Sequence, residues 1–244
     1  MALDPSLTDW CAMVLAAGRG ARMRPISATT PKPLIEVAGK ALIDHVFDRL
    51  EEAGVSRFVV NVHYLADLIE VHVKRRAGDK VAISDERAKL LETGGALVKA
   101  RGLIGEAPFI VANADTFWIE GVSNNIHRMT TLFDPAQMDG LLLLAPTVGA
   151  VGYDGAGDFE LGADGRLARR GERSVAPFVY AGCGIFLPSI LDEAPEGSFS
   201  LNVLLDRSIA SGRLYGLRMD GRWMHVGTPD AIGEADRAYA ASAA

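Results

Sequence analysis

"CAMVLAAGRGARMRPISATTPKPLIEVAGK", residues 11–40, joins an apolar run to a glycine-containing loop that carries several basic side chains. Residues 11–15 have the length and composition of a buried strand. Between residues 14 and 40 the single acid is Glu36, against five basic residues, which are Arg19, Arg22, Arg24, Lys32 and Lys40. The whole chain has a formal net charge of −6. Positive charge is therefore concentrated at one place in an acidic protein, which favours a small anion as partner.

Strand-like and helix-like segments alternate through the first half of the chain. Segments in which apolar residues recur at helical spacing lie between the strand-like runs. The expected helices are 40–54, 64–76 and 94–102. The expected strands are 11–15, 57–62, 80–84 and 108–115. Such alternation produces right-handed crossovers between parallel strands. We therefore expect an α/β fold with a Rossmann-like, mostly parallel central sheet and helices on both faces.

The second half of the chain has a different pattern. Asp164-Gly165 is a hairpin signal within residues 157–170, and the closing helix is expected to begin at Pro229. A helix at 200–212 is expected to have Ser200 as its N-cap. The remaining expected strands are 140–146, 178–187, 213–219 and 222–226. We expect one domain, residues 1–244, with a small antiparallel insertion at about 150–185.

Composition limits the class of protein. No apolar stretch approaches the roughly 20 residues of a membrane span, and the N-terminus lacks the pattern of a signal peptide. Cys11 and Cys183 both lie in apolar, strand-like sequence, which indicates buried thiols in a reducing compartment. A pI near 5.4 argues against a nucleic-acid-coating protein. We expect a cytoplasmic protein without membrane or nucleic-acid partners.

The glycine loop has the parts of a phosphate cradle. Gly18 and Gly20 let backbone N–H groups approach an anion closely. Arg22 can add a charge-assisted fork worth about 1.5–3 kcal/mol, and Lys32 stands in the stiff setting of Pro31 and Pro33. The loop matches neither G-x-G-x-x-G, because Met23 occupies the third glycine position, nor a Walker loop. A plain tight turn is the alternative interpretation.

The complete string L-A-A-G-x-G-x-R-M-x-P, followed by P-K-P-L, resembles the signature of the nucleoside-diphosphate-sugar pyrophosphorylases. These sugar-1-phosphate nucleotidyltransferases join a nucleoside triphosphate to a sugar 1-phosphate and release pyrophosphate. The resemblance extends over essentially the whole chain. It implies that the triphosphate is held by Ala17, Gly18, Arg19, Gly20, Ala21 and Arg22. The implied reaction is a metal-assisted in-line attack that needs no nucleophilic side chain. Arg22 and Lys32 would stabilise charge at the reacting phosphates.

Asp115 ends the apolar run 108–115, so it should emerge at the carboxyl edge of the sheet beside the glycine loop. A carboxylate there suits Mg²⁺, which prefers oxygen ligands and usually keeps waters. The tripeptide N-A-D, residues 113–115, resembles the family's N-G-D at the metal position, with Ala114 in place of glycine. The resemblance implies that Asn113 faces the sugar phosphate. A turn-capping role for Asp115 is the alternative.

Two further segments resemble parts of the family's substrate site. The segment 90–100 resembles the part that holds the nucleobase and sugar, which assigns nucleotide contacts to Glu92, Gly94 and Gly95. Residues 157–161 and 178–186 resemble the strands of the sugar pocket, which makes Asp158, Tyr180 and Gly182 candidates. The alternatives are a capped helix start with spacer glycines for the first segment, and ordinary strands and turns for the second.

The C-terminal signature departs from the family. The pattern W-x-D-V-G-T reads here as Trp223-Met224-His225-Val226-Gly227-Thr228, with histidine in place of the second metal-binding aspartate. Imidazole suits softer ions better than Mg²⁺. Three arrangements are open. Mg²⁺ rests on Asp115, the triphosphate and waters with His225 behind them, or His225 binds a softer ion such as Mn²⁺, or the site does not catalyse.

The substrates are expected from the same resemblance. L-E-T-G-G at 91–95, the compact length and G-D-F at 157–159 favour UTP and N-acetylmuramate 1-phosphate, and with them a role in peptidoglycan recycling. Mannose- or heptose-1-phosphate guanylyl transfer is the alternative reaction. A regulatory subunit that binds a nucleotide sugar without turnover is the alternative of another class. The sequence leaves the oligomeric state open.

Overall fold

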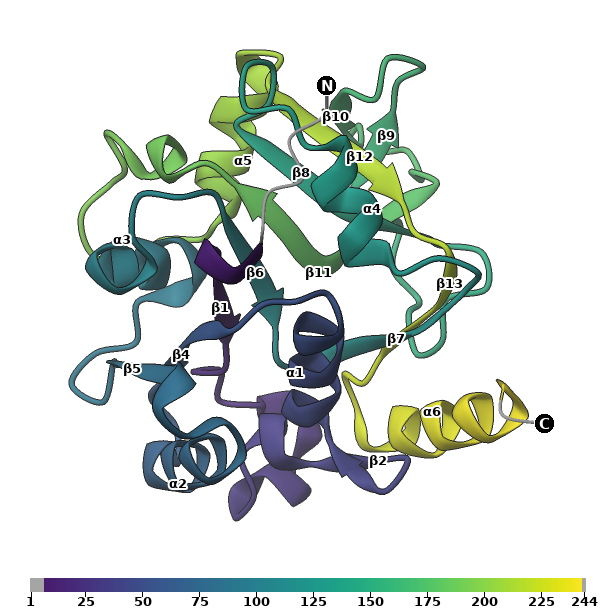
Figure 1. The fold of residues 1–244 in the computed structure, drawn as a ribbon. Coiled ribbons are helices and arrows are strands. Elements are labelled where there is room, and N and C mark those ends of the chain that lie inside the picture. The colour runs from purple at the N-terminus through teal and green to yellow at the C-terminus, as the bar shows by residue number, and fades with distance from the viewer. Residues whose placement is uncertain (1–6, 243–244) are drawn as a thin grey trace.

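A nine-stranded mixed sheet forms the centre of the computed structural model, which describes residues 7–242 (Figure 1). β1 lies in the middle, hydrogen-bonded in parallel to β4 on one side and β6 on the other, and β5 pairs in parallel with β4. These strands are β1 (Cys11–Leu15), β4 (Arg57–Val62), β5 (Val81–Asp85) and β6 (Phe109–Asn113). The expected parallel half of the sheet is confirmed.

The remaining strands extend the sheet beyond β6. β11 runs antiparallel to both β6 and β8, and β12 pairs in parallel with β8. Asp164 and Gly165 lie in the turn of the expected hairpin, β9–β10, which meets the first residue of β11. The strands are β8 (Gly140–Pro146), β9 (Phe159–Leu161), β10 (Leu167–Arg169), β11 (Phe178–Phe186) and β12 (Leu214–Arg218). β11 therefore belongs to the central sheet, and the β9–β10 hairpin continues that sheet beyond β11.

Helices cover both faces of the sheet, as expected. Alternate residues of β1 face opposite sides: Ala12 and Val14 pack in the cluster that includes α1, α2 and α4, whereas Cys11 and Met13 pack with α3 and α5. The helices on the first face are α1 (Leu42–Glu52), α2 (Ala66–Ala77) and α4 (Asn125–Leu132). Those on the second face are α3 (Glu92–Ile104) and α5 (Asn202–Ala210).

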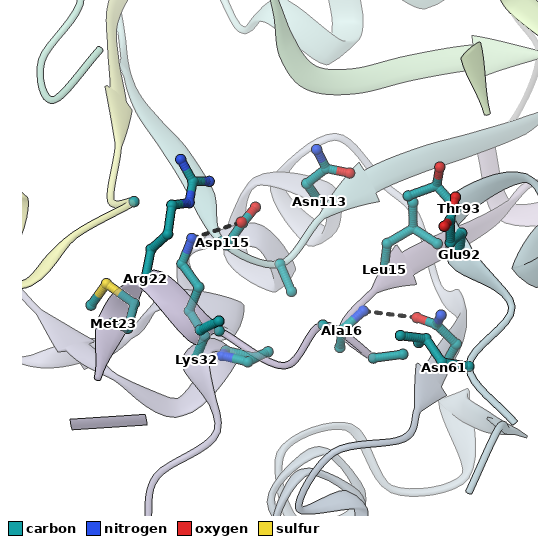
Figure 2. A pocket seen from close by; sticks show the side chains of 18 of the residues that line it. Leu15, Ala16, Arg22, Met23, Lys32, Asn61, Glu92, Thr93, Asn113 and Asp115 are labelled. Atoms are coloured by element: carbon teal, nitrogen blue, oxygen red, sulfur yellow. Dashed lines mark hydrogen bonds and ion pairs between the residues drawn. The ribbon is translucent and has the colours of Figure 1, made fainter. Parts of the chain in front are cut away.

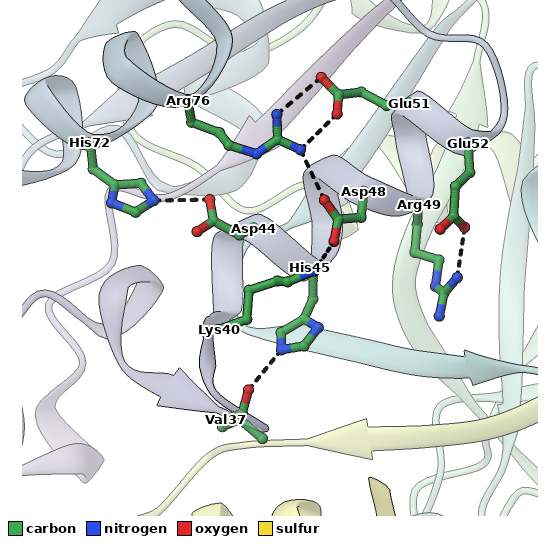
Figure 3. A network of polar contacts seen from close by, with 10 residues as sticks. All are labelled: Val37, Lys40, Asp44, His45, Asp48, Arg49, Glu51, Glu52, His72 and Arg76. Carbon is green, nitrogen blue, oxygen red and sulfur yellow. Dashed lines mark hydrogen bonds and ion pairs between the residues drawn. The ribbon is translucent and has the colours of Figure 1, made fainter. Parts of the chain in front are cut away.

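A polar network ties α1 to α2 on the first face (Figure 3). The Arg76 guanidinium contacts Asp48 at 2.9 Å and Glu51 at 2.7 Å, and His72 contacts Asp44 at 2.9 Å. Burial would raise the pKa of Asp48, but hydrogen bonds from Lys40 and Arg76 outweigh it, so this pKa lies below its ordinary value. The ionised carboxylate therefore stabilises the folded state.

A third group of elements lies beside the sheet. β7 (Thr116–Glu120) continues from the end of β6 and pairs antiparallel with β13 (Gly221–His225). A small core of Met23, Phe117, Met224 and Val226 joins this ribbon to α6 (Pro229–Ser242). The other short elements are β2 (Glu36–Val37), β3 (Lys40–Ala41), η1 (Leu7–Asp9), η2 (Ala21–Met23), η3 (Ile26–Ala28), η4 (Lys32–Leu34), η5 (Gly78–Lys80) and η6 (Pro188–Leu191).

Local details both support and correct the sequence expectations. Pro229 begins α6 as expected. The expected N-cap of α5 is wrong, because Leu201 already has helical backbone angles and takes the N-cap position ahead of Asn202. Ser200 instead accepts a hydrogen bond from the backbone N–H of Asn202 at 3.2 Å. None of the helices within residues 7–242 is long and apolar enough to cross a membrane.

The two cysteines are buried and free, as their apolar surroundings indicated. Burial raises the pKa of Cys11 to about 11 and that of Cys183 to about 12. Both thiols therefore stay protonated near neutral pH and are poor nucleophiles.

Candidate active site

The loop after β1 turns sharply at Gly20. This residue has a φ of +59°, and its carbonyl accepts hydrogen bonds from the Met23 N–H at 2.9 Å and the Ser27 hydroxyl at 2.7 Å. A Cβ at this position would stand 3.1 Å from the Cβ of Lys32. Both the left-handed backbone and the close approach of Lys32 therefore require glycine here.

Gly18, in the same loop, has a different explanation. A Cβ built on it meets no protein atom within 4 Å, and its φ lies outside the positive range that favours glycine. Neither backbone geometry nor packing within the protein calls for glycine at this position. The residue lines a cavity instead, so the space next to its backbone is free for a ligand.

That cavity has a volume of about 500 Å³ and lies at the carboxyl ends of β1, β4 and β6 (Figure 2). Ligands of open α/β sheets bind at this edge. Its lining comes mainly from the first strand and its loop, the start of α3 and the N-A-D segment, namely residues 15–18, 20–23, 32, 33, 61, 90, 92, 93, 113–115, 200 and 227.

Three charged side chains predicted from the sequence meet in this cavity. Lys32 donates to Asp115 Oδ2 at 2.8 Å, and the lysine side chain is only 9% exposed against 34% for the aspartate. The Arg22 side chain extends into the same space above this pair (Figure 2). One carboxylate and two cations at a sheet edge form a site for a strongly anionic ligand.

A second cavity of about 760 Å³ adjoins the first. The two share Arg22 and Gly227 in their walls. The second cavity lies between the loop after β8 and the start of α6, and it is lined by residues 22, 150–155, 225, 227, 228, 230, 231 and 234. Arg22 therefore stands where the contents of the two cavities would meet.

His225 reaches the junction through strand pairing. It ends β13 directly opposite Thr116, the residue that follows Asp115. Its ring stacks on Trp223 at 5.5 Å, and its Nδ1 atom is buried without a hydrogen-bond partner among the described residues. Burial lowers the pKa of His225, and the charges of Lys32 and Arg22 lower it further against the opposing effect of Asp115. The imidazole is therefore neutral near pH 7.

The start of α3 forms the far wall of the first cavity. Glu92 lines it with a φ of +57°, a conformation that is costly for a residue with a side chain and is typically found at functional sites. Gly94 and Gly95 lie deeper, where both backbone N–H groups donate to the Phe199 carbonyl. A Cβ on Gly94 would come within 2.3 Å of the Phe199 ring. These two glycines serve the packing of α3 against the 197–199 segment.

Four other predicted residues lie outside the walls of both cavities. Asp158 accepts a hydrogen bond from the Tyr180 N–H at 3.0 Å, and Gly182 has a φ of +82° at the irregularity of β11. Burial raises the pKa of Tyr180 well above its ordinary value, and its hydroxyl has no partner within residues 7–242. Arg19 belongs to the glycine loop but does not line either cavity.

Sequence reasoning missed several lining residues. Asn61 lies near the end of β4, as Asp115 follows β6, so a polar residue at a strand end was an available signal. Thr93 was not missed, because it lies in the segment expected to hold the nucleobase and sugar; it lines the first cavity and accepts a hydrogen bond from the Leu201 N–H at 2.8 Å. Tyr153 and Asp154 come from the loop after β8, inside the insertion expected at about 150–185, but no motif in the sequence marks these two residues individually.

Comparison with known proteins identifies the family of this chain. A model of the family described as nucleotidyl transferase matches residues 11–152. The chain belongs to this family. The transferase is 47% identical over 224 residues to the N-acetylmuramate alpha-1-phosphate uridylyltransferase of Caulobacter vibrioides, a match that covers 90% of the chain and 93% of that protein. The resemblance found in the sequence is confirmed, and the chain is an enzyme that transfers nucleotidyl groups.

Other relatives of the transferase are more distant. The protein of the same name from Neisseria meningitidis serogroup B is 35% identical over 92% of the chain and 96% of that protein. Mannose-1-phosphate guanyltransferase beta-A of Xenopus laevis is 28% identical over 89% of the chain and 61% of that protein. The crystal structure of HddC from Yersinia pseudotuberculosis, complexed with GMP-PN, has a TM-score of 0.75 and 22% identity over 94% of the chain and 99% of that protein. The last likeness confirms the fold.

Transferases of this family generally use a divalent metal ion. Within residues 7–242, no group of three or more His, Cys, Asp or Glu residues is placed to hold a metal ion. One partly exposed carboxylate, Asp115, lines the first cavity, and its charge acts on His225, whose Nδ1 atom has no hydrogen-bond partner among the described residues. Such a donor set fits a cation whose other ligands are phosphate oxygens and waters.

Proposed function

We propose that the transferase joins UTP to N-acetylmuramate 1-phosphate, forming the uridine diphosphate sugar and pyrophosphate. The base and the sugar come from the names of the two relatives with 47% and 35% identity, whose matches cover nearly the whole chain. The first cavity would hold UTP and the second the sugar phosphate. The observation that carries the proposal is that the two cavities adjoin at Arg22, beside the Lys32–Asp115 pair.

The proposed chemistry is an in-line displacement at the α-phosphorus of UTP. An oxygen of the sugar phosphate attacks, the bond from the α-phosphorus to the bridging oxygen breaks, and pyrophosphate leaves with that electron pair. Lys32 and Arg22 would neutralise charge on the reacting and departing phosphates. The N–H groups of the 17–21 loop would hold the triphosphate in line.

A side-chain nucleophile is not needed for this reaction. The two thiols are buried, their pKa values are about 11 and about 12, and neither lines a cavity. Direct transfer between the two substrates therefore has more support than a covalent intermediate on a cysteine.

Asp115 would hold the divalent cation together with phosphate oxygens and waters. We propose Mg²⁺, with Mn²⁺ as the alternative because an imidazole at position 225 suits a softer ion better. When bound, the cation would supply further charge neutralisation at the transferring phosphate.

The ends of the two cavities distant from Arg22 would recognise the base and the sugar. Glu92, Thr93 and Asn61 offer polar groups around the far part of the first cavity. Asn113, at the end of β6, lines the first cavity and would face the sugar phosphate where the two substrates meet. Asp158, Tyr180 and Gly182 would act on the sugar indirectly, by fixing the irregular course of β11. We propose that the enzyme works as one domain in the cytoplasm, in peptidoglycan recycling.

Pyrophosphate release tests the proposal. The enzyme is incubated with Mg²⁺, each nucleoside triphosphate and a panel of sugar 1-phosphates, and we expect turnover with UTP and N-acetylmuramate 1-phosphate. Turnover confined to GTP with mannose or heptose 1-phosphate would overturn the substrate assignment. Tight nucleotide binding without turnover of any pair would overturn the catalytic role.

Lys32→Ala links the assay to the cavity junction. Loss of one preorganised cation should lower kcat by about 10²–10³-fold. Lys74→Ala on the exposed side of α2 is the matched control and should leave turnover within twofold. Unchanged turnover in a folded Lys32→Ala variant would place the reaction elsewhere.

A further inference from the structure

Glu86, directly after β5, is completely buried, and no basic side chain within residues 7–242 forms an ion pair with it. Its Oε1 accepts from Asn61 Nδ2 at 2.8 Å, and its Oε2 accepts from the Leu91 N–H at 2.9 Å. Burying a carboxylate without a cation is costly. Its presence calls for a role that a neutral side chain could not fill.

The carboxylate fixes the direction of a chain of hydrogen bonds. An ionised carboxylate only accepts, so the Asn61 amide must turn its NH₂ group toward Glu86. The Asn61 oxygen then faces the other way and accepts from the Ala16 N–H at 2.8 Å (Figure 2). A glutamine at position 86 would present a donor on one side, so one of the three hydrogen bonds would be replaced by two donors that face each other.

The chain of bonds joins two walls of the first cavity. Ala16 begins the glycine loop, and Leu91 is the N-cap of α3, directly before Glu92. Asn61 itself lines the cavity between them. This chain of three hydrogen bonds, called the relay below, therefore sets the distance between the loop that would hold the phosphates and the helix start that would face the nucleoside.

We propose that Glu86 is a positioning residue for nucleotide binding, acting through Asn61 on the backbone of Ala16. The proposal rests on the proposed function in that the first cavity takes the nucleoside triphosphate. Glu86 lies outside the cavity lining, so its effect on the ligand passes through its two partners. The relay fixes which group donates and which accepts in each hydrogen bond, and these roles can be exchanged between the side chains at positions 61 and 86.

Exchange of the two functional groups tests this polarity. Glu86→Gln leaves one donor facing another somewhere among the three bonds, and Asn61→Asp sets two carboxylates against each other. In the double variant Asn61→Asp/Glu86→Gln, the new carboxylate at position 61 accepts from the Ala16 N–H and from the new amide at position 86. The oxygen of that amide accepts from the Leu91 N–H. All three bonds return, and the net charge equals that of the native chain.

We expect each single variant to weaken UTP binding, measured by calorimetry without the second substrate, by tenfold or more. KM for UTP should rise in parallel, with a smaller change in kcat. The double variant should bind UTP at least fivefold more tightly than either single variant. A double variant that bound UTP no more tightly than the weaker-binding single variant would overturn the proposal. A core that is merely disturbed would not be repaired by a second substitution.

A second asparagine–glutamate contact, which is partly buried, provides the control. Asn125 donates from its side chain and its backbone to Glu120, which also accepts from Trp118 Nε1 at 2.8 Å. This pair joins β7 to α4 and lines neither cavity. Glu120→Gln should lower the thermal midpoint while leaving UTP affinity within twofold. If Glu86→Gln likewise lost only stability, Glu86 would have no positioning role.

Failure of the proposed function gives a different result. If the native enzyme bound UTP but turned over no sugar phosphate, the affinity comparison among the Glu86 and Asn61 variants would still decide the positioning role. If the native enzyme bound GTP and excluded UTP, the same comparison would be made with GTP. If the native enzyme bound no nucleoside triphosphate, both proposals would fall.

Discussion

At the scale of single residues, the two glycines of the first loop have opposite reasons for being glycine. Gly20 is held by a left-handed backbone and by the neighbouring Lys32, whereas Gly18 borders open space in the cavity. The sequence shows both as G-x-G and offers no way to separate them. Only the folded structure shows that Gly20 shapes the loop and that Gly18 leaves room for a ligand.

This difference predicts two distinct phenotypes. Gly20→Ala should reduce the free energy of unfolding by about 1–2 kcal/mol, because alanine is strained in the left-handed region. Gly18→Ala should leave the unfolding midpoint unchanged and raise KM for UTP severalfold, because the added methyl group enters the cavity. Denaturant unfolding and initial rates measure the two effects. Equal losses of stability in both variants would contradict the assignment of Gly18.

His225 gives a second prediction at this scale. Its Nδ1 atom makes no hydrogen bond that the described structure would lose, and the nearby Lys32 and Arg22 can balance a new carboxylate. His225→Asp should therefore leave Mg²⁺-dependent turnover equal or higher. Inactivation of this variant, with its thermal midpoint retained, would show that the imidazole itself takes part in the reaction.

At the scale of elements, hydrophobic periodicity was sufficient for the long strands and helices. β1, β4 and β8 fill their expected ranges. Their continuous apolar runs are buried because helices cover both faces of the sheet. β7 and α4 were not expected. β7 follows β6 after a two-residue turn, and its partner β13 lies near the other end of the chain. Pairing over that separation leaves no local signal.

The polar network between α1 and α2 carries the prediction for elements. Arg76→Met removes the contacts with Asp48 and Glu51 and should reduce the free energy of unfolding at pH 7 by about 1 kcal/mol. Because the pKa of Asp48 is lowered in the folded state, its contribution is complete above the ordinary value of 3.8 and is lost as pH falls below it.

The stability difference between native and Arg76→Met proteins should therefore shrink as the pH is reduced from 7 to 3. Denaturant unfolding at the two pH values measures it, with exposed Arg75→Met as the control. A difference that stayed constant over this range would assign the effect of Arg76 to its position over the Phe47 ring, 5.9 Å away, instead of to the carboxylates.

At the scale of the whole molecule, the candidate site is assembled from distant parts of the chain. Arg22, Lys32 and Asp115 could be predicted because each belongs to a motif, and Asp115 also follows directly after the apolar run of β6. The second cavity could not, since it depends on how the loop after β8 meets the end of β13 and the start of α6. Gly94 and Gly95 show the opposite case, where a family motif marks residues that the structure uses for packing.

This assembly predicts how a ligand stabilises the enzyme. The first cavity takes lining residues from position 15 to position 227, so a bound nucleotide contacts both halves of the chain. UTP at 100 times its Kd should stabilise the folded state by about 2.7 kcal/mol, which raises the midpoint of a protein of this size by about 5–10 °C. Scanning calorimetry should show one transition that shifts as a whole. Two transitions, of which UTP moved only one, would contradict the single-domain prediction, because a single cooperative unit cannot unfold in separable halves.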